Sequence, residues 1–413
     1  MHYFIYKNNK LFCEDVALET IAKKVGTPTY VYSQATLTRH FKAYEDVLKN
    51  HDHLVCFSVK ANSNLSVLKL LSKLGAGFDI VSQGELYRVL KAGGNPQKVV
   101  FSGVGKTQEE MAYALQKNIL CFNVESDQEL ALLNLVAQKL KKKAPVSIRV
   151  NPDIDPKTHP YISTGLKENK FGIPIKEALA LYQRASEFSA IQFIGIDCHI
   201  GSQMLSLEPI LESVRELKKV ILDLKQKGIH IRHLNIGGGL GIPYSKEVPP
   251  SPQEYLKDVL QELKDLKIKL LCEPGRTIVG NAGILLTKVL YTKKTTSKNF
   301  IIVDAAMNDL IRPTLYDAHH EIWPVEKRSL ASISVDVVGP ICESGDFLAK
   351  ERELPHSHAG DFLAILSAGA YGFSMSSNYN SRPRVAEVLV NGKSFKVCRK
   401  RETLNDLIRG ENL

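Results

Sequence analysis

Short apolar runs alternate with longer amphipathic segments over residues 31–276. The runs carry apolar side chains continuously or at every second position, which favours buried β-strands. The segments between them repeat apolar residues at intervals of three and four, which predicts amphipathic helices. Several of these segments end in a glycine, as many helices do. The eight runs, in chain order, are LVCFSVK, AGFDIVS, KVVFSG, ILCFNVES, APVSIRVN, IQFIGIDCHI, IRHLNIGGG and IKLLCEPGR.

Eight strand and helix pairs in about 250 residues are typical of a closed (β/α)8 barrel. An open, doubly wound sheet has the same periodicity, so that alternative stays open here. After residue 276 the strands follow one another without regular helices, which predicts a second, all-β domain. The N-terminal stretch HYFIYKNNKLFCE resembles a hairpin that joins this domain. We therefore predict an α/β protein with a TIM-type barrel over residues 28–278 and a β domain over residues 1–27 plus 279–413.

Composition narrows the class of protein. The chain has 413 residues, of which 44% are hydrophobic and 24% charged, as in globular proteins. It shows no signal-peptide pattern and no apolar run of bilayer length, so we expect a cytoplasmic protein that does not bind membranes. The net charge of +10 is spread along amphipathic segments without interleaved aromatic residues, which argues against nucleic-acid binding. Seven cysteines without a CxxC spacing predict reduced thiols and no metal site.

Polar residues collect where the apolar runs end. Barrel enzymes place their reactive groups at the carboxyl ends of the strands, so these side chains are expected to share one site. The residues at these ends are Lys60, Asp79, His199, Gly237, Gly238, Gly239, Glu273 and Arg276.

Lys60 follows the apolar positions Val55, Phe57 and Val59. It is either an exposed strand end or a desolvated amine that can condense with a carbonyl compound. The three glycines after the seventh run favour a phosphate site, because backbone N–H groups can approach a phosphate there. They lack the full spacing of a dinucleotide fingerprint, which makes that interpretation weaker. A nucleophilic lysine with a phosphate cradle suggests pyridoxal phosphate.

Two further strand-end residues fit such a cofactor. Glu273 can keep the pyridine nitrogen protonated, which makes the ring a strong electron sink. His199 can lie against one face of the ring; the alternative, a core histidine, is less favoured beside Ser202 in HIGSQ.

Six motifs carry a resemblance over nearly the whole chain: SVKAN, HIGSQ, NIGGGLG, CEPGR, GPICESGDFL and GAYGFSMSSNYNSRPR. In this order they resemble the pyridoxal-phosphate decarboxylases of the alanine racemase-like fold, and most closely the diaminopimelate decarboxylase family. The resemblance implies a (β/α)8 barrel with a β domain, and a homodimer whose active sites are shared across the interface. That family often has Tyr-Ala before Lys-Ala-Asn, and we expect Ser58-Val59 here to change the packing of the strand without putting any implied role in doubt.

The resemblance also implies a role for each matching residue. Lys60 binds the cofactor covalently, Glu273 contacts the pyridine nitrogen and His199 stacks on the ring. Tyr371 contacts both cofactor and substrate, while Cys342 and Glu343 enter from the partner subunit. The remaining residues implied around the cofactor are Asp79, Ser202, Gly237, Gly238, Gly239, Pro274, Gly275 and Arg276.

We expect the enzyme to recognise its substrate at the end of the molecule distant from the reacting carbon. Arg312 and Tyr316, with Arg276, can hold a carboxylate, and Glu343 can hold an ammonium group. Arg312 has a simpler alternative as a surface arginine next to a proline. An ornithine-like substrate ends in a cation alone and requires an acidic residue instead.

The resemblance therefore implies decarboxylation of meso-2,6-diaminopimelate at its D centre, with L-lysine and CO2 as products, in the last step of lysine biosynthesis. Cys342 is the candidate acid that returns a proton, unless it is an inert core thiol. The alternatives are a decarboxylase of another basic amino acid or polyamine precursor, and a non-catalytic protein that binds pyridoxal phosphate. A racemase is less favoured, because that activity requires an arginine at position 273. The segment HPYISTGLKENKFGI also resembles this family, and we assign it no role beyond a loop after the fifth strand.

Overall fold

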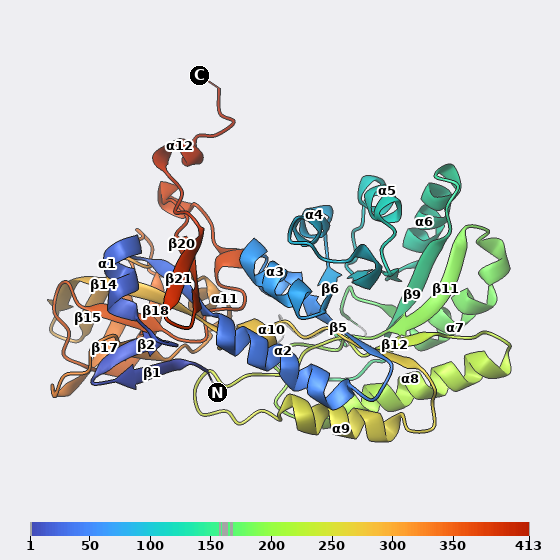
Figure 1. Cartoon of the computed structure of the whole chain (residues 1–413), viewed down its shortest axis with the longest axis horizontal. Helices are drawn as coiled ribbons and strands as arrows, with labels where there is room; N and C mark the ends of the chain where they lie inside the picture. Colours follow the sequence, from blue (N-terminus) through green and yellow to red (C-terminus); the bar gives the residue numbers. More distant parts are fainter. Residues whose placement is uncertain (1, 157, 159–163, 166–167, 413) are drawn as a thin grey trace. The chain divides into compact units, whose positions relative to one another are not determined.

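The computed structural model describes residues 2–156, 158, 164–165 and 168–412, and the chain divides into two compact units (Figure 1). Unit 1 consists of Met1–His40, Pro243–Glu247 and Ile278–Leu413, and unit 2 of Phe41–Ile242 and Val248–Thr277. In the described ranges, no helix combines the length and the apolar character that crossing a membrane requires.

Unit 2 is a closed parallel barrel. Neighbouring strands pair in chain order, and the last strand pairs with the first through Leu270 with His53 and Cys272 with Val55. This closure confirms the predicted (β/α)8 barrel and excludes the open sheet. The strands are β5 (His53–Ser58), β6 (Gly77–Ile80), β7 (Val99–Phe101), β8 (Cys121–Val124), β9 (Ala144–Asn151), β11 (Ile191–Asp197), β12 (His233–Asn235) and β13 (Lys269–Cys272).

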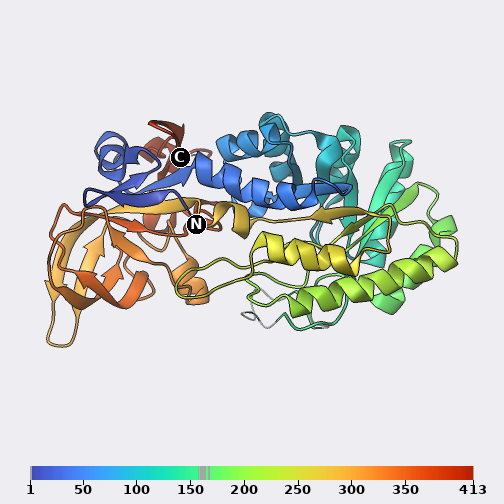
Figure 2. The same ribbon diagram turned by 60° about the horizontal axis from the view of Figure 1, so that its bottom comes forward.

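The helices of unit 2 form the outer layer of the barrel. Ser82, Thr107, Ser126 and Ser251 accept a hydrogen bond from a backbone N–H of the first helical turn, which satisfies donors that a helix start leaves free. Figure 2 shows the long helices α8 and α9 side by side, in lime and yellow. The helices wholly within unit 2 are α3 (Leu65–Lys73), α4 (Gln83–Lys91), α5 (Gln108–Lys117), α6 (Asp127–Lys139), α7 (Ile175–Gln183), α8 (Glu208–Gln226) and α9 (Pro252–Glu262). Two more, α2 (Gln34–Leu48) and α10 (Arg276–Val279), have residues in both units.

The loop expected over residues 159–173 lies partly outside the described residues, which include 164–165 and 168–173 of it. Its end is described: β10 (Ile173–Pro174) pairs in parallel with the end of β9.

Unit 1 is built on a mixed β-sheet with strand order β18-β17-β15-β14-β4-β20-β21. Its core joins strands that are distant in sequence, because Val31, Ile284 and Val388 lie in one buried cluster. The strands are β4 (Thr29–Ser33), β14 (Gly283–Lys294), β15 (Asn299–Val303), β16 (Ile322–Pro324), β17 (Ser332–Val338), β18 (Phe347–Pro355), β19 (Phe362–Ile365), β20 (Ala386–Asn391) and β21 (Ser394–Arg399). Short helices α1 (Leu18–Val25), α11 (Arg312–Tyr316) and α12 (Leu404–Leu407) accompany them.

The N-terminal hairpin is present. β1 (Phe4–Lys7) pairs with β2 (Lys10–Cys13), and β3 (Val16–Ala17) adds a third strand. Asn8 and Asn9 at the turn both have positive φ, which suits the tight turn of a two-residue hairpin. Phe4 and Leu11 belong to the same buried cluster as the strands of the large sheet.

The structure divides the chain differently from the predicted boundary at residue 28. Residues 29–33 form β4, which pairs with β14 and β20 of unit 1. All five side chains of β4 are buried, because the strand lies in the interior of that sheet. Residues 243–247, inside the range predicted for the barrel, also belong to unit 1.

Candidate active site

Lys60 lies just beyond the end of β5, in a single 3-10 turn formed by Val59–Ala61. Its Nζ is 2.6 Å from Asp79 Oδ2, and Asp79 belongs to the neighbouring strand β6. The Lys60 side chain is 35% exposed whereas the Asp79 side chain is fully buried. Val55, Phe57 and Val59 are buried as well, so a rigid apolar strand holds an accessible amine beside a buried carboxylate.

Glu273 follows β13 and is buried at the same end of the barrel. Its Oε1 accepts hydrogen bonds from Asn235 Nδ2 at 2.6 Å and from Asn123 Nδ2 at 3.4 Å. Burial raises the pKa of Glu273 well above its usual range, and the nearby carboxylates of Asp79 and Asp197 raise it further. A cationic ring nitrogen would remove the cost of this buried charge.

His199 lies in the loop that follows β11. Gly238 N–H donates to its Nδ1 at 3.2 Å, so Nδ1 is the unprotonated nitrogen. Burial lowers the pKa of His199 well below its usual range, and the positive charges of Arg149 and Lys60 lower it further. The ring is therefore neutral and suited to packing against an aromatic cofactor.

The glycine run after β12 is shaped by close backbone contacts. A Cβ atom on Gly238 would lie 2.2 Å from Glu273 O, and one on Gly239 would lie 2.2 Å from Gly201 O. Gly237 and Gly239 also have positive φ. No larger residue fits these positions, so the glycines allow this loop to pack closely against the backbone of Glu273 and Gly201.

The N–H groups of Gly237 and Gly238 bond Asn235 Oδ1 and His199 Nδ1. Gly239 is thus the glycine of this run best suited to a phosphate. Arg276 Nη2 donates to Ser202 Oγ at 2.9 Å, which places a cation and a hydroxyl together in unit 2. Pro274 O accepts from Ser58 N, and a Cβ on Gly275 would lie 3.0 Å from Ser58 Cβ, so this segment packs directly on the end of β5.

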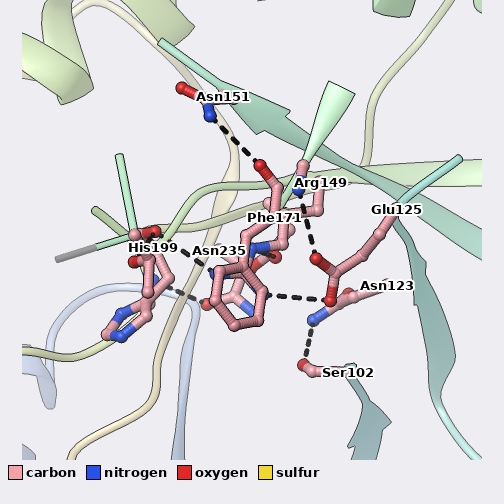
Figure 3. A network of polar contacts seen from close by, with 12 residues as sticks. Ser102, Asn123, Glu125, Arg149, Asn151, Phe171, His199 and Asn235 are labelled. Atoms are coloured by element: carbon pink, nitrogen blue, oxygen red, sulfur yellow. Dashed lines mark hydrogen bonds and ion pairs between the residues drawn. The ribbon is translucent and has the colours of Figure 1, made fainter. Parts of the chain in front are cut away.

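A network of polar contacts around Arg149 was not predicted from the sequence (Figure 3). Arg149 on β9 forms an ion pair with Glu125 at 3.0 Å and donates to His199 O at 3.4 Å. Its guanidinium also lies 4.9 Å from the Phe171 ring centroid. Arg149 thereby fixes the backbone that carries His199. The available signal was a polar residue inside an apolar strand, as in SIRVN and, for Asn123, in ILCFNVES.

Arg312 is buried in unit 1, so it is not the surface arginine considered as an alternative. Its Nη1 is 2.9 Å from His320 Nε2, and its guanidinium lies 4.5 Å from the Tyr244 ring centroid. His320 Nδ1 is 2.8 Å from Leu366 O. Since a carbonyl oxygen only accepts, Nδ1 carries the proton and Nε2 accepts from Arg312. Tyr316, at the end of the same short helix, is half-buried.

The loop after β17 carries Cys342 and Glu343. Cys342 is exposed, unlike the five buried cysteines of the chain, which removes the alternative of an inert core thiol. Its N–H donates to Asn380 Oδ1, and Glu343 Oε2 accepts from Tyr379 OH at 2.8 Å. Tyr371, also in unit 1, is half-buried and has a φ of 55°, a conformation that bulky residues rarely adopt. Such strain is often found at functional sites.

The structure thus brings together two groups of candidate residues, each within one unit. In unit 2, the barrel end combines an accessible amine, a buried carboxyl, a neutral histidine and a closely packed glycine loop. These are the groups that a pyridoxal-phosphate enzyme of the barrel type uses to bind its cofactor.

Comparisons with known proteins also identify a pyridoxal-phosphate enzyme. Residues 34–280 match the family model described as pyridoxal-dependent decarboxylase, pyridoxal binding domain. A curated diaminopimelate decarboxylase from Pseudomonas aeruginosa is 57% identical over 413 residues, covering 100% of this chain and 99% of that protein. The chain belongs to the diaminopimelate decarboxylase family of pyridoxal-dependent decarboxylases, and its cofactor is pyridoxal phosphate.

Two solved structures of the family extend the likeness to the fold. The diaminopimelate decarboxylase from Helicobacter pylori complexed with L-lysine has a TM-score of 0.92 at 46% identity, covering 95% of this chain and 98% of that one. The enzyme from M. jannaschii in co-complex with L-lysine has a TM-score of 0.94 at 38% identity, covering 99% and 98%.

Proposed function

We propose that this protein decarboxylates meso-2,6-diaminopimelate at its D centre and releases L-lysine and CO2, the last step of lysine biosynthesis. The observation that carries the choice of substrate is the buried Arg312, fixed by His320 and Tyr244. A buried guanidinium suits a distal carboxylate, to which it can donate charge-assisted hydrogen bonds, and it repels a distal ammonium group. Ornithine, arginine and lysine all end in a cation, so this residue disfavours the alternative of a decarboxylase for those substrates.

The residues of unit 2 fit the cofactor. When bound, pyridoxal phosphate supplies an electron sink for the electron pair that remains when CO2 departs. Lys60 Nζ would be the covalent attachment point, which the substrate amine would have to displace. Glu273 would hold a proton at the pyridine nitrogen, His199 would pack on the ring, and Asp79 would orient the Lys60 amine. Ser202, Gly239, Gly275 and Arg276 are the proposed phosphate ligands.

The residues of unit 1 are proposed to bind the substrate. Arg312 and Tyr316 hold the distal carboxylate, and Glu343 holds the distal ammonium group. Tyr371 contacts both cofactor and substrate. Cys342, an exposed thiol, returns a proton to the carbon that has lost CO2.

We also propose a homodimer in which Cys342 and Glu343 act in the site of the partner subunit. Their position on an exposed loop supports this, because a loop at the surface can reach another subunit. All seven cysteines are free thiols, which supports a reducing, cytoplasmic location.

A substrate panel tests the proposed activity. The purified protein is supplied with pyridoxal phosphate, and CO2 release is measured with meso-diaminopimelate, ornithine, arginine and lysine. We expect CO2 and lysine from the first alone, and a large loss of affinity for it in Arg312→Ala. Release from ornithine or arginine that survives Arg312→Ala would instead establish the alternative substrate class.

Reduction with borohydride tests whether pyridoxal phosphate is attached to Lys60 or bound at another place in the protein. Peptide mass analysis should then find the reduced cofactor on Lys60, and on no peptide of Lys60→Ala. Attachment elsewhere would contradict the assignment of Lys60.

A further inference from the structure

We propose that Ser58 is a positioning residue of the cofactor site, whose hydroxyl keeps Asp79 aligned while the Lys60 amine is away from it. Ser58 is the last residue of β5 and is buried. Its Oγ lies 3.0 Å from Asp79 Oδ2 and 2.9 Å from Glu273 O. The side chain of Ser58 is therefore part of a hydrogen-bond chain in addition to any effect that it has on strand packing.

Ser58 and Lys60 share one carboxylate oxygen. Lys60 Nζ lies 2.6 Å from Asp79 Oδ2, the same atom that Ser58 Oγ contacts. Asp79 Oδ1 is buried and makes no hydrogen bond with any described residue. Ser58 and Lys60 are thus the described side chains that satisfy this carboxylate.

The hydroxyl has one proton and two acceptors within reach. The backbone carbonyl of Glu273 can only accept, and an ionised Asp79 can only accept. While the Lys60 ammonium serves Oδ2, the Ser58 proton can point to Glu273 O. When Lys60 leaves, a rotation of the hydroxyl alone brings the proton to Oδ2, with no movement of the backbone.

This rotation matters because Lys60 must leave and return. The proposed function has the substrate amine displace Lys60 in each cycle, and this inference rests on that proposal. A buried carboxylate without a donor turns away or takes up a proton, since an unsatisfied buried charge is costly. Ser58 prevents this, so Asp79 is still in place when the amine comes back.

The test measures cofactor capture by protein that has been stripped of pyridoxal phosphate, because the Lys60 amine has to leave Asp79 to reach the aldehyde in that step. It uses the absorbance change on binding and no substrate. We expect Ser58→Ala to capture the cofactor roughly 10-fold to 100-fold more slowly, the range of one hydrogen bond to a charged group. Ser58→Thr keeps the hydroxyl and should restore most of the rate. Ser147→Ala is the matched control, because Ser147 on β9 is equally buried and its Oγ makes no hydrogen bond with a described residue.

A double-mutant cycle with Asp79→Asn separates positioning from packing. If Ser58 acts through Asp79, adding Ser58→Ala to Asp79→Asn should slow capture further by less than twofold. An equal slowing in both backgrounds, or capture by Ser58→Ala at the wild-type rate, would overturn the proposal. Thermal unfolding of each variant identifies a folding defect, and Ser58→Thr then still decides whether the hydroxyl matters.

The outcome does not depend on which amino acid the enzyme decarboxylates, because no substrate is present. Failure of the wild-type protein to capture pyridoxal phosphate would contradict the proposed function itself. Normal capture by both wild type and Ser58→Ala would contradict only the role of Ser58.

Discussion

Arg312 contacts two uncharged groups, the neutral imidazole of His320 and the ring of Tyr244. Because neither group is an anion, these two contacts hold the guanidinium without neutralising its charge. The strand-end rule predicted Lys60, Asp79 and Glu273 as neighbours from sequence alone. It could not predict His320, because the contact with Leu366 that sets its tautomer spans 46 residues.

We predict that His320→Phe weakens substrate binding. The phenyl ring can keep the edge contact that His320 makes with Tyr244, with centroids 5.3 Å apart, but it removes the acceptor for Arg312. We expect KM for meso-diaminopimelate to rise about 10-fold, the effect of losing one hydrogen bond to a charged group, with a smaller change in kcat. Steady-state kinetics over a range of substrate concentrations measures both.

His319→Phe is the control, because His319 is half-exposed and bonds Glu321 instead of Arg312. An unchanged KM in His320→Phe would show that Arg312 does not need His320 to meet the substrate.

Some strands can be predicted from their own residues, whereas the pairing of others depends on residues far away in the sequence. The eight barrel strands are predictable because each is an apolar run that pairs with the next run along the chain. β4 and β14 were not assigned to one sheet, because their pairing joins residues 29–32 to residues 283–286. Side-chain contacts across strands are equally non-local: a Cβ on Gly195 of β11 would lie 2.0 Å from His233 Nε2 of β12. That glycine leaves the room that the His233 ring occupies.

The buried His233 makes the barrel sensitive to acid. Burial, and then the charge of Lys269, lower its pKa from 6.5 to about 4. Between these values the unfolded chain binds a proton at His233 that the folded chain does not, so stability is lost as the pH falls from 6.5 to 4. From pH 7.5 to pH 5 this residue should cost about 2 kcal/mol of unfolding free energy.

Urea unfolding at both pH values tests this prediction. His233→Asn should lose about 2 kcal/mol less than wild type between them, whatever its stability at pH 7.5. His358→Asn, at an exposed histidine of unit 1, should behave as wild type does. Equal losses in wild type and His233→Asn would mean that His233 does not titrate on unfolding.

Over the whole chain, the candidate residues fall into two groups with different origins. Lys60, Asp79 and Glu273 belong to the barrel of unit 2, and Cys342 and Glu343 to a loop of unit 1. The barrel group follows from a general rule about strand ends, so the sequence reveals it. The loop group follows no such rule and was found through the family resemblance. In the proposed dimer, the loop residues of one subunit and the barrel residues of the other would form one active site.

Mixing two inactive variants tests whether one site takes residues from both subunits. Lys60→Ala lacks the cofactor attachment point, and Cys342→Ala lacks the proposed acid. In a mixed dimer with shared sites, one site carries both defects and the other carries neither. Random pairing makes about half of the dimers mixed, so about one quarter of all sites, and of wild-type activity, should return.

Mixing Lys60→Ala with the Lys60→Ala/Cys342→Ala double variant should restore none. If differently tagged subunits are shown to exchange and activity still does not return, Cys342 serves the barrel of its own chain, and the proposed sharing of sites is wrong.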